Sequence, residues 1–184
     1  MSFHPIMPYK EGFQKSDRVL LQKGEPFAYT PERAAKLEDI CSKYPPEWRK
    51  SAVLAALYLV QDQQGYLTAT ALRHVAQFLR ITPAEVEDVA TYYVMFYKAP
   101  VGKYVLQVCR TLSCAIRGGP ALLAQCEKRL GVSVGGTKGD FTLEHAECLA
   151  SCGTAPVLTV NDEFHENLTP EKVDAILDRI GAPK

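Results

Sequence analysis

Four of the chain's six cysteines lie in two short clusters, and each cluster follows a segment typical of a β-strand. The first cluster has the pattern C-x4-C (Cys109 and Cys114), and the second has the pattern C-x3-C (Cys148 and Cys152). A strand before each cluster gives the following loop a fixed starting point. We therefore predict that the two loops meet at one edge of a sheet and bring the four thiols together.

Three chemistries use four cysteines in this way: disulfides, a zinc ion or an iron–sulfur cluster. Disulfides are disfavoured, because no signal peptide is recognised and the reducing cytosol keeps thiols unpaired. Both spacings fall within the two to four residues that separate paired zinc ligands, and ligation by four cysteines is the usual form of a [2Fe–2S] cluster. His145 lacks the paired C-x-H spacing of a Rieske ligand. The spacing thus favours a metal site. It favours an iron–sulfur cluster over zinc but does not exclude zinc.

Composition narrows the class of protein further. Lys and Arg together number 21, as do Asp and Glu, so the chain lacks the concentrated positive charge of a nucleic-acid binder. The longest apolar run, Ala52 to Val60, is too short to span a bilayer. The first residues have neither the apolar core nor the cleavage site of a targeting peptide. We expect a cytoplasmic protein that binds no nucleic acid and does not insert into a membrane.

Residues 29–98 have the pattern of a helical bundle, preceded at 1–28 by an arm without periodicity. Four helices are expected, and their starts are marked by Thr30, Pro46, Thr68 and Thr82. The second helix is expected to run unbroken to Gln64, and the fourth to continue into Tyr97. His74 lies off the apolar face of the third helix and is expected to be solvated.

The spacing of apolar residues is no longer helical after a break at 99–102, and residues 101–184 predict a β-α-β-β-α domain. Its expected elements are a strand at 103–108, a helix from Gly118 to Leu130, strands at 141–147 and 157–160, and a helix from Thr169. The glycine-rich stretch 131–140 fits neither phosphate-binding pattern and is interpreted as a connector. Cys41 and Cys126 recur with apolar residues and are interpreted as core. The whole predicts an α+β protein, a helical bundle followed by a thioredoxin-like α/β domain.

Four segments match a known family. They are EDVATYYVMF at 87–96, PVGKY at 100–104, C-x4-C with RGG at 117–119, and ECLASCG-x-AP at 147–156. With these motifs the chain, from about Thr30 to Ile180, resembles the thioredoxin-like [2Fe–2S] subunit of the NADH-dehydrogenase module of respiratory complex I. The resemblance implies a [2Fe–2S] cluster held by Cys109, Cys114, Cys148 and Cys152, with each local pair on one iron. Analogy with the fold also predicts a cis peptide before Pro156.

The function that this resemblance implies is electron transfer within an NADH:quinone oxidoreductase. Iron–sulfur clusters carry single electrons whereas NADH gives up a hydride, so a flavin must lie between them, and this chain has no dinucleotide fingerprint. The resemblance implies FMN and NADH on a partner flavoprotein subunit, further peripheral-arm subunits, and a place at the inner membrane through the complex. No catalytic residue is expected in the chain itself. The alternatives are the same module in an NAD-dependent formate dehydrogenase or NAD-reducing hydrogenase, and a zinc-stapled interaction module.

The environment of such a cluster sets its reduction potential. Backbone amides of the two cysteine loops are expected to donate hydrogen bonds to the sulfurs. Arg110 and Arg117 would favour the reduced, more negative state, whereas Glu144 and Glu147 would oppose it. The balance between these charges stays open from the sequence.

Overall fold

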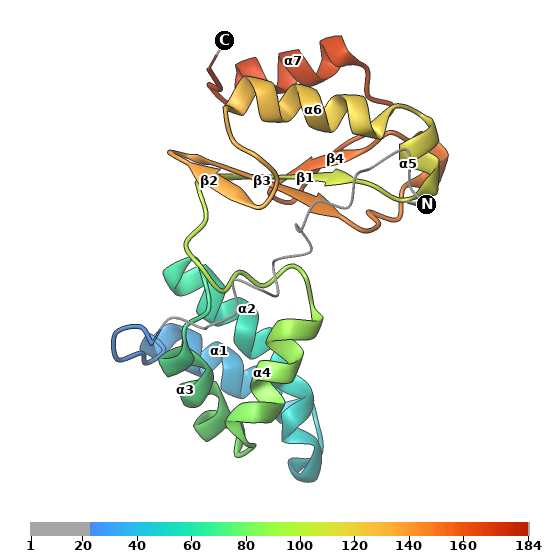
Figure 1. The fold of residues 1–184 in the computed structure, drawn as a ribbon. Helices are drawn as coiled ribbons and strands as arrows, with labels where there is room; N and C mark the ends of the chain where they lie inside the picture. The colour runs from blue at the N-terminus through green and yellow to red at the C-terminus, as the bar shows by residue number, and fades with distance from the viewer. Residues whose placement is uncertain (1–22, 184) are drawn as a thin grey trace, which may run out of the picture. The chain divides into compact units, whose positions relative to one another are not determined.

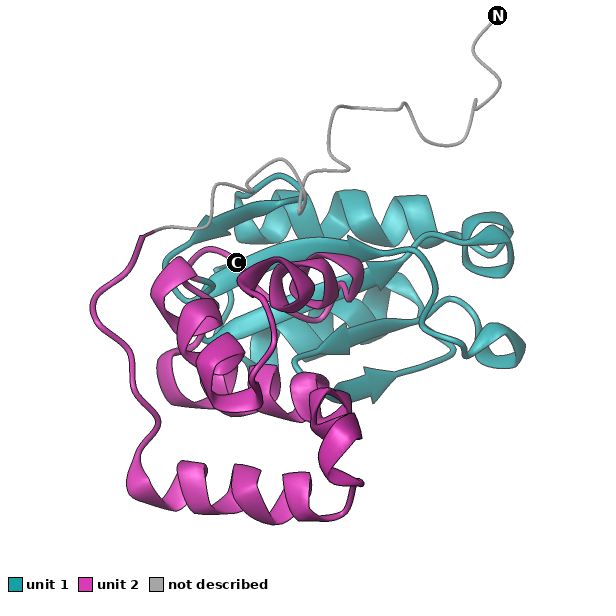
Figure 2. Ribbon diagram, turned by 90° about the horizontal axis from the view of Figure 1, so that it is seen from below, with its two compact units in different colours: residues 1–14, 101–184 teal, residues 15–100 magenta. Residues whose placement is uncertain are grey.

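The computed structural model describes residues 23–183, which divide into two compact units (Figure 2). The helical unit extends to Pro100, and the sheet unit begins at Val101. Of the predicted N-terminal arm, only residues 23–28 belong to the described part of the chain. Within that part, no helix is both long and apolar enough to cross a membrane.

Helices make up the helical unit (Figure 1). They are α1 (Pro31–Ser42), the 3-10 helix η1 (Pro46–Ala52), α2 (Val53–Gln64), α3 (Ala69–Leu79) and α4 (Pro83–Tyr92). Each α-helix contributes fully buried side chains to one apolar core, and Leu37, Leu57, Val60, Val75 and Val86 show no exposed surface. Cys41 belongs to the same core, as predicted.

Threonine caps begin three of these helices, where the sequence predicted them. The side chains of Thr30, Thr68 and Thr82 each accept a hydrogen bond from the backbone N–H three residues later. Thr82 forms a complete capping box, because Glu85 accepts in turn from the Thr82 N–H at 2.9 Å. At the other end of α2, Gly65 has a φ of 84°, the left-handed conformation that ends many helices.

Two predicted helix boundaries are wrong. The helix expected from Pro46 to Gln64 is divided, because the backbone of Trp48 leaves helical angles and the first seven residues form η1. The helix expected to continue into Tyr97 ends at Tyr92. There the side chain of Gln61 donates to the carbonyl of Met95 at 3.0 Å and accepts from the N–H of Tyr97 at 2.8 Å. One amide from α2 therefore replaces the hydrogen bonds of a further helical turn.

The expectation of a solvated His74 is also wrong. Its ring is half-buried and meets the rings of Phe27 and Tyr29 edge-on, with centroids 5.5 and 5.2 Å away. Burial lowers the pKa of His74. The two aromatic rings come from the segment before α1. The spacing of apolar residues within α3 gives no information about contacts with that segment.

The sheet unit is built on five strands in the order β2-β3-β1-β4-β5. The strands are β1 (Tyr104–Cys109), β2 (Gly136–Lys138), β3 (Phe141–Ala146), β4 (Leu158–Val160) and β5 (Glu163–His165). β1 and β3 are parallel, and the other neighbours are antiparallel. α6 (Gly119–Leu130) and α7 (Pro170–Arg179) lie on one face of the sheet, drawn above it in Figure 1. Cys126 is fully buried between that face and the helices, as predicted.

This architecture confirms the α+β class, and it adds four short elements to the predicted order: β2, α5, η2 and β5. β2 lies inside the stretch interpreted as a connector, and it forms because Gly136 to Lys138 pair with β3. The short helix α5 (Leu112–Ile116) occupies the first cysteine loop. The short 3-10 helix η2 (Cys152–Thr154) follows the second loop. The peptide between Ala155 and Pro156 is cis, as predicted.

Candidate iron–sulfur site

The sheet topology starts both cysteine loops at the same edge. Cys109 is the last residue of β1 and pairs with Ala146, the last residue of β3. Because these strands are parallel, their carboxyl ends lie side by side. The N–H of Arg110 donates to the carbonyl of Ala146 at 3.0 Å and carries the pairing one step beyond the strands. Cys148 follows β3 after one intervening residue, so the two loops leave the sheet as neighbours.

The thiols of Cys109 and Cys114 form the buried half of the site. Both side chains pack in a small apolar cluster with Ala155, Val157 and Leu149. They are hydrogen-bonded to each other, and the N–H of Val157 also donates to the sulfur of Cys114. Burial, and next the bond with Cys109, raise the pKa of Cys114 to about 11, against the effect of the Val157 amide.

Cys148 and Cys152 form the exposed half of the site. The N–H of Ala150 donates to the sulfur of Cys148 at 3.2 Å. Ala150 has a φ of 57°, which turns the loop sharply between the two cysteines. Cys152 begins η2, which packs against α5, and its charge acts on Cys114. Cys152 is therefore close enough to affect the ionisation of Cys114.

Two backbone amides thus point at cysteine sulfurs. The Ala150 amide lies in the second cysteine loop, where donors were predicted. The Val157 amide was missed, because it lies directly before β4 and reaches the sulfur only through the pairing of β4 with β1. N–H to sulfur bonds of this kind stabilise thiolates and tune iron–sulfur clusters.

The charges beside the cysteines compensate one another in part. Arg110 and Glu147 form a two-fold ion pair at 3.0 and 2.5 Å, and these residues stand next to Cys109 and Cys148. The guanidinium of Arg117 donates to the carbonyl of Ala155 at 2.8 Å. Arg110 and Glu147, one from each side of the balance that the sequence left open, therefore form an ion pair that links the two loops.

Two glycines let the chain turn tightly behind Cys114. Gly118 has a φ of 97°, which L-residues with side chains rarely adopt. Gly119 lies so close to the loop that a Cβ there would come within 2.8 Å of the carbonyl oxygen of Cys114. Glycine is therefore required at 118 by the backbone conformation and at 119 by the lack of space for a side chain.

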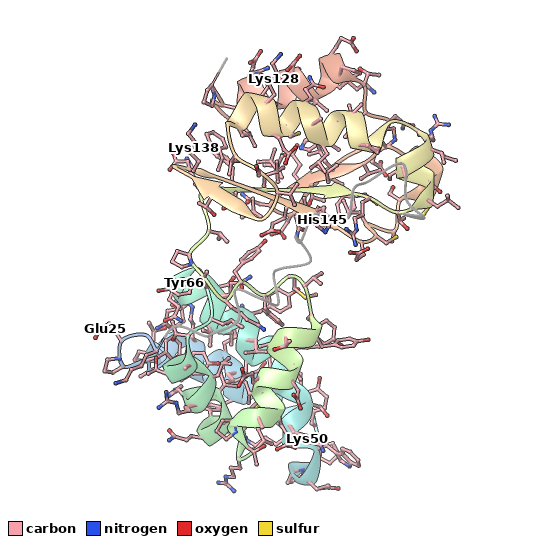
Figure 3. The ribbon with its side chains drawn as sticks, in the orientation of Figure 1. Glu25, Lys50, Tyr66, Lys128, Lys138 and His145 are labelled. Atoms are coloured by element: carbon pink, nitrogen blue, oxygen red, sulfur yellow. The ribbon has the colours of Figure 1, made fainter. Side chains whose placement is uncertain are left out.

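The four cysteines supply the donor set that a [2Fe–2S] cluster uses. Such a cluster has two irons, each of which takes two thiolates, so its four sulfurs need not surround one point. Among residues 23–183, no three His, Cys, Asp and Glu side chains are grouped closely enough to hold one ion. His145 lies half-buried on β3 (Figure 3). The two cysteine pairs and the amides that donate to them are compatible with a binuclear cluster.

Comparison with known proteins identifies the family of the chain. The family model described as thioredoxin-like [2Fe–2S] ferredoxin matches residues 37–181. The chain is 40% identical over 157 residues to the E subunit of the NADH-quinone oxidoreductase of Rickettsia bellii, covering 84% of this chain and 94% of that protein. It is 39% identical over 158 residues to the mitochondrial NADH dehydrogenase [ubiquinone] flavoprotein 2 of Dictyostelium discoideum, covering 84% of this chain and 64% of that protein.

Solved structures share the fold. The air-oxidised NAD+-reducing [NiFe]-hydrogenase superposes with a TM-score of 0.61 at 22% identity. The likeness covers 70% of this chain and only 22% of the hydrogenase chain. At this identity the comparison concerns the fold alone.

The chain therefore belongs to the thioredoxin-like [2Fe–2S] ferredoxin family. Within this family it is of the type represented by the E subunits of bacterial NADH-quinone oxidoreductases. The resemblance inferred from the motifs, and the thioredoxin-like assignment of the second half, are confirmed.

Proposed function

We propose that this chain is an electron-transfer subunit of an NADH:quinone oxidoreductase, the respiratory complex I. In this proposal Cys109, Cys114, Cys148 and Cys152 hold one [2Fe–2S] cluster, with each local pair on one iron. The observation that carries it is the departure of both cysteine loops from the paired ends of β1 and β3. The family match and the relatives at about 40% identity support the same conclusion.

When bound, the cluster would accept and release one electron at a time. The residues of the chain bind it and control its surroundings. The amides of Val157 and Ala150 donate to the sulfurs of Cys114 and Cys148, which favours their thiolate forms. The apolar contacts around Cys109 and Cys114 keep water from that half of the site. The exposed cysteines leave the other half open.

A partner has to bring the flavin to this site. The sequence has no dinucleotide fingerprint, so we place FMN and NADH on a partner flavoprotein subunit. Leu112 and Ile116 stand one turn apart on α5, and 75% and 69% of their surfaces are exposed. Cys114, between them in sequence, is buried on the other side of the same helix. We propose that this apolar pair docks on the flavoprotein, and that the assembled peripheral arm holds the chain at the cytoplasmic face of the inner membrane.

Metal analysis and spectroscopy test the cluster. We expect the chain, loaded with iron and sulfide, to hold two irons and two sulfides, and to give an EPR signal when reduced. Cys114→Ala should lose most of this iron, because each iron needs both thiolates of its pair. Cys126→Ala is the matched control, a buried cysteine of the same unit, and should bind like wild type. A colourless protein with one zinc per chain would contradict the proposal and favour the zinc-stapled module.

Co-expression with candidate flavoproteins tests the partner and the host complex. We expect NADH to reduce the cluster only when the cognate flavoprotein is present. Leu112→Glu should weaken the co-purification, whereas Phe164→Glu, which changes an equally apolar and half-exposed side chain on β5, should not. Recovery of a formate dehydrogenase or hydrogenase flavoprotein instead would assign the chain to those complexes.

A further inference from the structure

The loop that carries Cys148 and Cys152 is tied to the segment between β5 and α7. Glu166 accepts hydrogen bonds from the hydroxyls of Ser151 and Thr154, the second at 2.7 Å. The two hydroxyl oxygens lie 2.6 Å apart. Ser151 directly precedes Cys152, and Thr154 ends the short helix η2 that Cys152 begins. The carboxylate therefore holds the loop on both sides of one cysteine.

Glu166 itself stands on a well-anchored segment. The N–H of Asn167 donates to the carbonyl of Thr154 at 2.7 Å, and the N–H of Leu168 donates to the carbonyl of Pro156 at 3.1 Å. Leu168 is buried in the core beneath α6 and α7. The position of the carboxylate is thus set by the packing of Leu168 and by backbone hydrogen bonds to Thr154 and Pro156.

The second loop needs such support more than the first. Cys109 and Cys114 are buried and fixed by the end of a strand and by apolar neighbours. Cys148 and Cys152 are exposed, in a loop that turns through the left-handed backbone of Ala150. Metal affinity depends on residues that hold the ligands in place, as much as on the ligands themselves.

We propose that Glu166 is a positioning residue of the cluster site: it holds the Cys148–Cys152 loop in the geometry that binds iron, and its negative charge lowers the reduction potential of the bound cluster. This inference rests on the proposed function. The charge matters because reduction adds one negative charge to the cluster, and a nearby carboxylate disfavours that. Nothing in the sequence singles out Glu166, since it lies 14 positions beyond Cys152.

Three variants of the full chain separate the two effects. Glu166→Gln keeps an acceptor oxygen and removes the charge. The double change Ser151→Ala with Thr154→Ala keeps the charge and removes the hydrogen bonds. Glu163→Gln is the matched control, because it removes an exposed carboxylate from β5 that pairs with Arg179 instead. Each protein is loaded with iron and sulfide, and circular dichroism confirms its fold.

Two readouts follow: the midpoint potential from a redox titration, and the rate at which a chelator removes iron. We expect Glu166→Gln to raise the equilibrium constant for one-electron reduction at least threefold, a positive shift of about 28 mV, with no such shift in Glu163→Gln. We expect the double variant to lose iron at least about fivefold faster than wild type. A Glu166→Gln potential equal to that of Glu163→Gln, together with wild-type iron loss in the double variant, would overturn the inference alone. A wild-type chain that takes up no iron and sulfide would overturn the proposed function with it.

Discussion

Replacing Gly119 by alanine is expected to displace the first cysteine loop. A Cβ at this position would lie 2.8 Å from the carbonyl oxygen of Cys114 and 3.3 Å from that of Cys109. Ordinary van der Waals contact begins at about 3.4 Å, and the neighbours here are backbone atoms that cannot rotate away. The backbone of Gly119 is outside the left-handed region, so the effect is purely steric.

The size of the effect follows from that overlap. Overpacking of this kind costs about 1–3 kcal/mol of the free energy of unfolding, which exceeds the gain of less than about 1 kcal/mol from replacing glycine in a helix. The loop must also shift by several tenths of an ångström, whereas metal–ligand distances hold to within about 0.2 Å. We therefore expect Gly119→Ala to be less stable and to hold iron less firmly.

Urea unfolding of the metal-free chain, followed by circular dichroism, measures the first effect, and iron loss to a chelator measures the second. The control is Gly153→Ala, which lies beside Cys152 but has open space around its Cβ and an ordinary backbone. That variant should stay within about 0.5 kcal/mol of wild type. If Gly119→Ala matches Gly153→Ala in both measurements, the steric reasoning is refuted.

Three further predictions concern the helical unit, whose unfolding the single tryptophan, Trp48, can report. Thr82→Ala should cost about 1 kcal/mol in urea unfolding, because it removes the N-cap of α4; no change would argue against the capping box. Tyr29→Phe should cost about 1 kcal/mol, since the hydroxyl donates to the carbonyl of Ala56 at 2.8 Å; equal midpoints would contradict this. Burial lowers the pKa of His74, so the unfolded chain takes up a proton first and stability falls as the pH drops below about 6.5. His74→Phe should flatten that fall between about pH 7.5 and about pH 5.5, and an unchanged slope would refute the assignment.

Local signals predicted much of the fold. The N-cap threonines and the prolines after them marked the starts of α1, α4 and α7, because these side chains act on their own first turn. The strand-like segment at 103–108 and the alternation at 141–147 identified β1 and β3. The end of α4 was not predictable in this way, since it depends on Gln61, a residue more than thirty positions earlier.

In the candidate site, too, local features could be predicted and long-range contacts could not. The cysteines could be selected by their spacing, and Arg110 and Glu147 by their place beside them. The sequence did not show that these two charges pair, or that the amide of Val157 meets Cys114, because both depend on how β1, β3 and β4 lie together. Helix α5 was missed because five residues are too few to display a period.

The parallel register of β1 with β3 also limits where evolution can change the length of this protein. Successive strand residues face opposite sides of a sheet, so losing one residue inside β1 would turn Cys109 toward the helices that cover Leu106 and Val108. The connection between α6 and β2 runs outside that register. Insertions and deletions among relatives should therefore collect at 131–135 and be absent from 104–109 and 141–146.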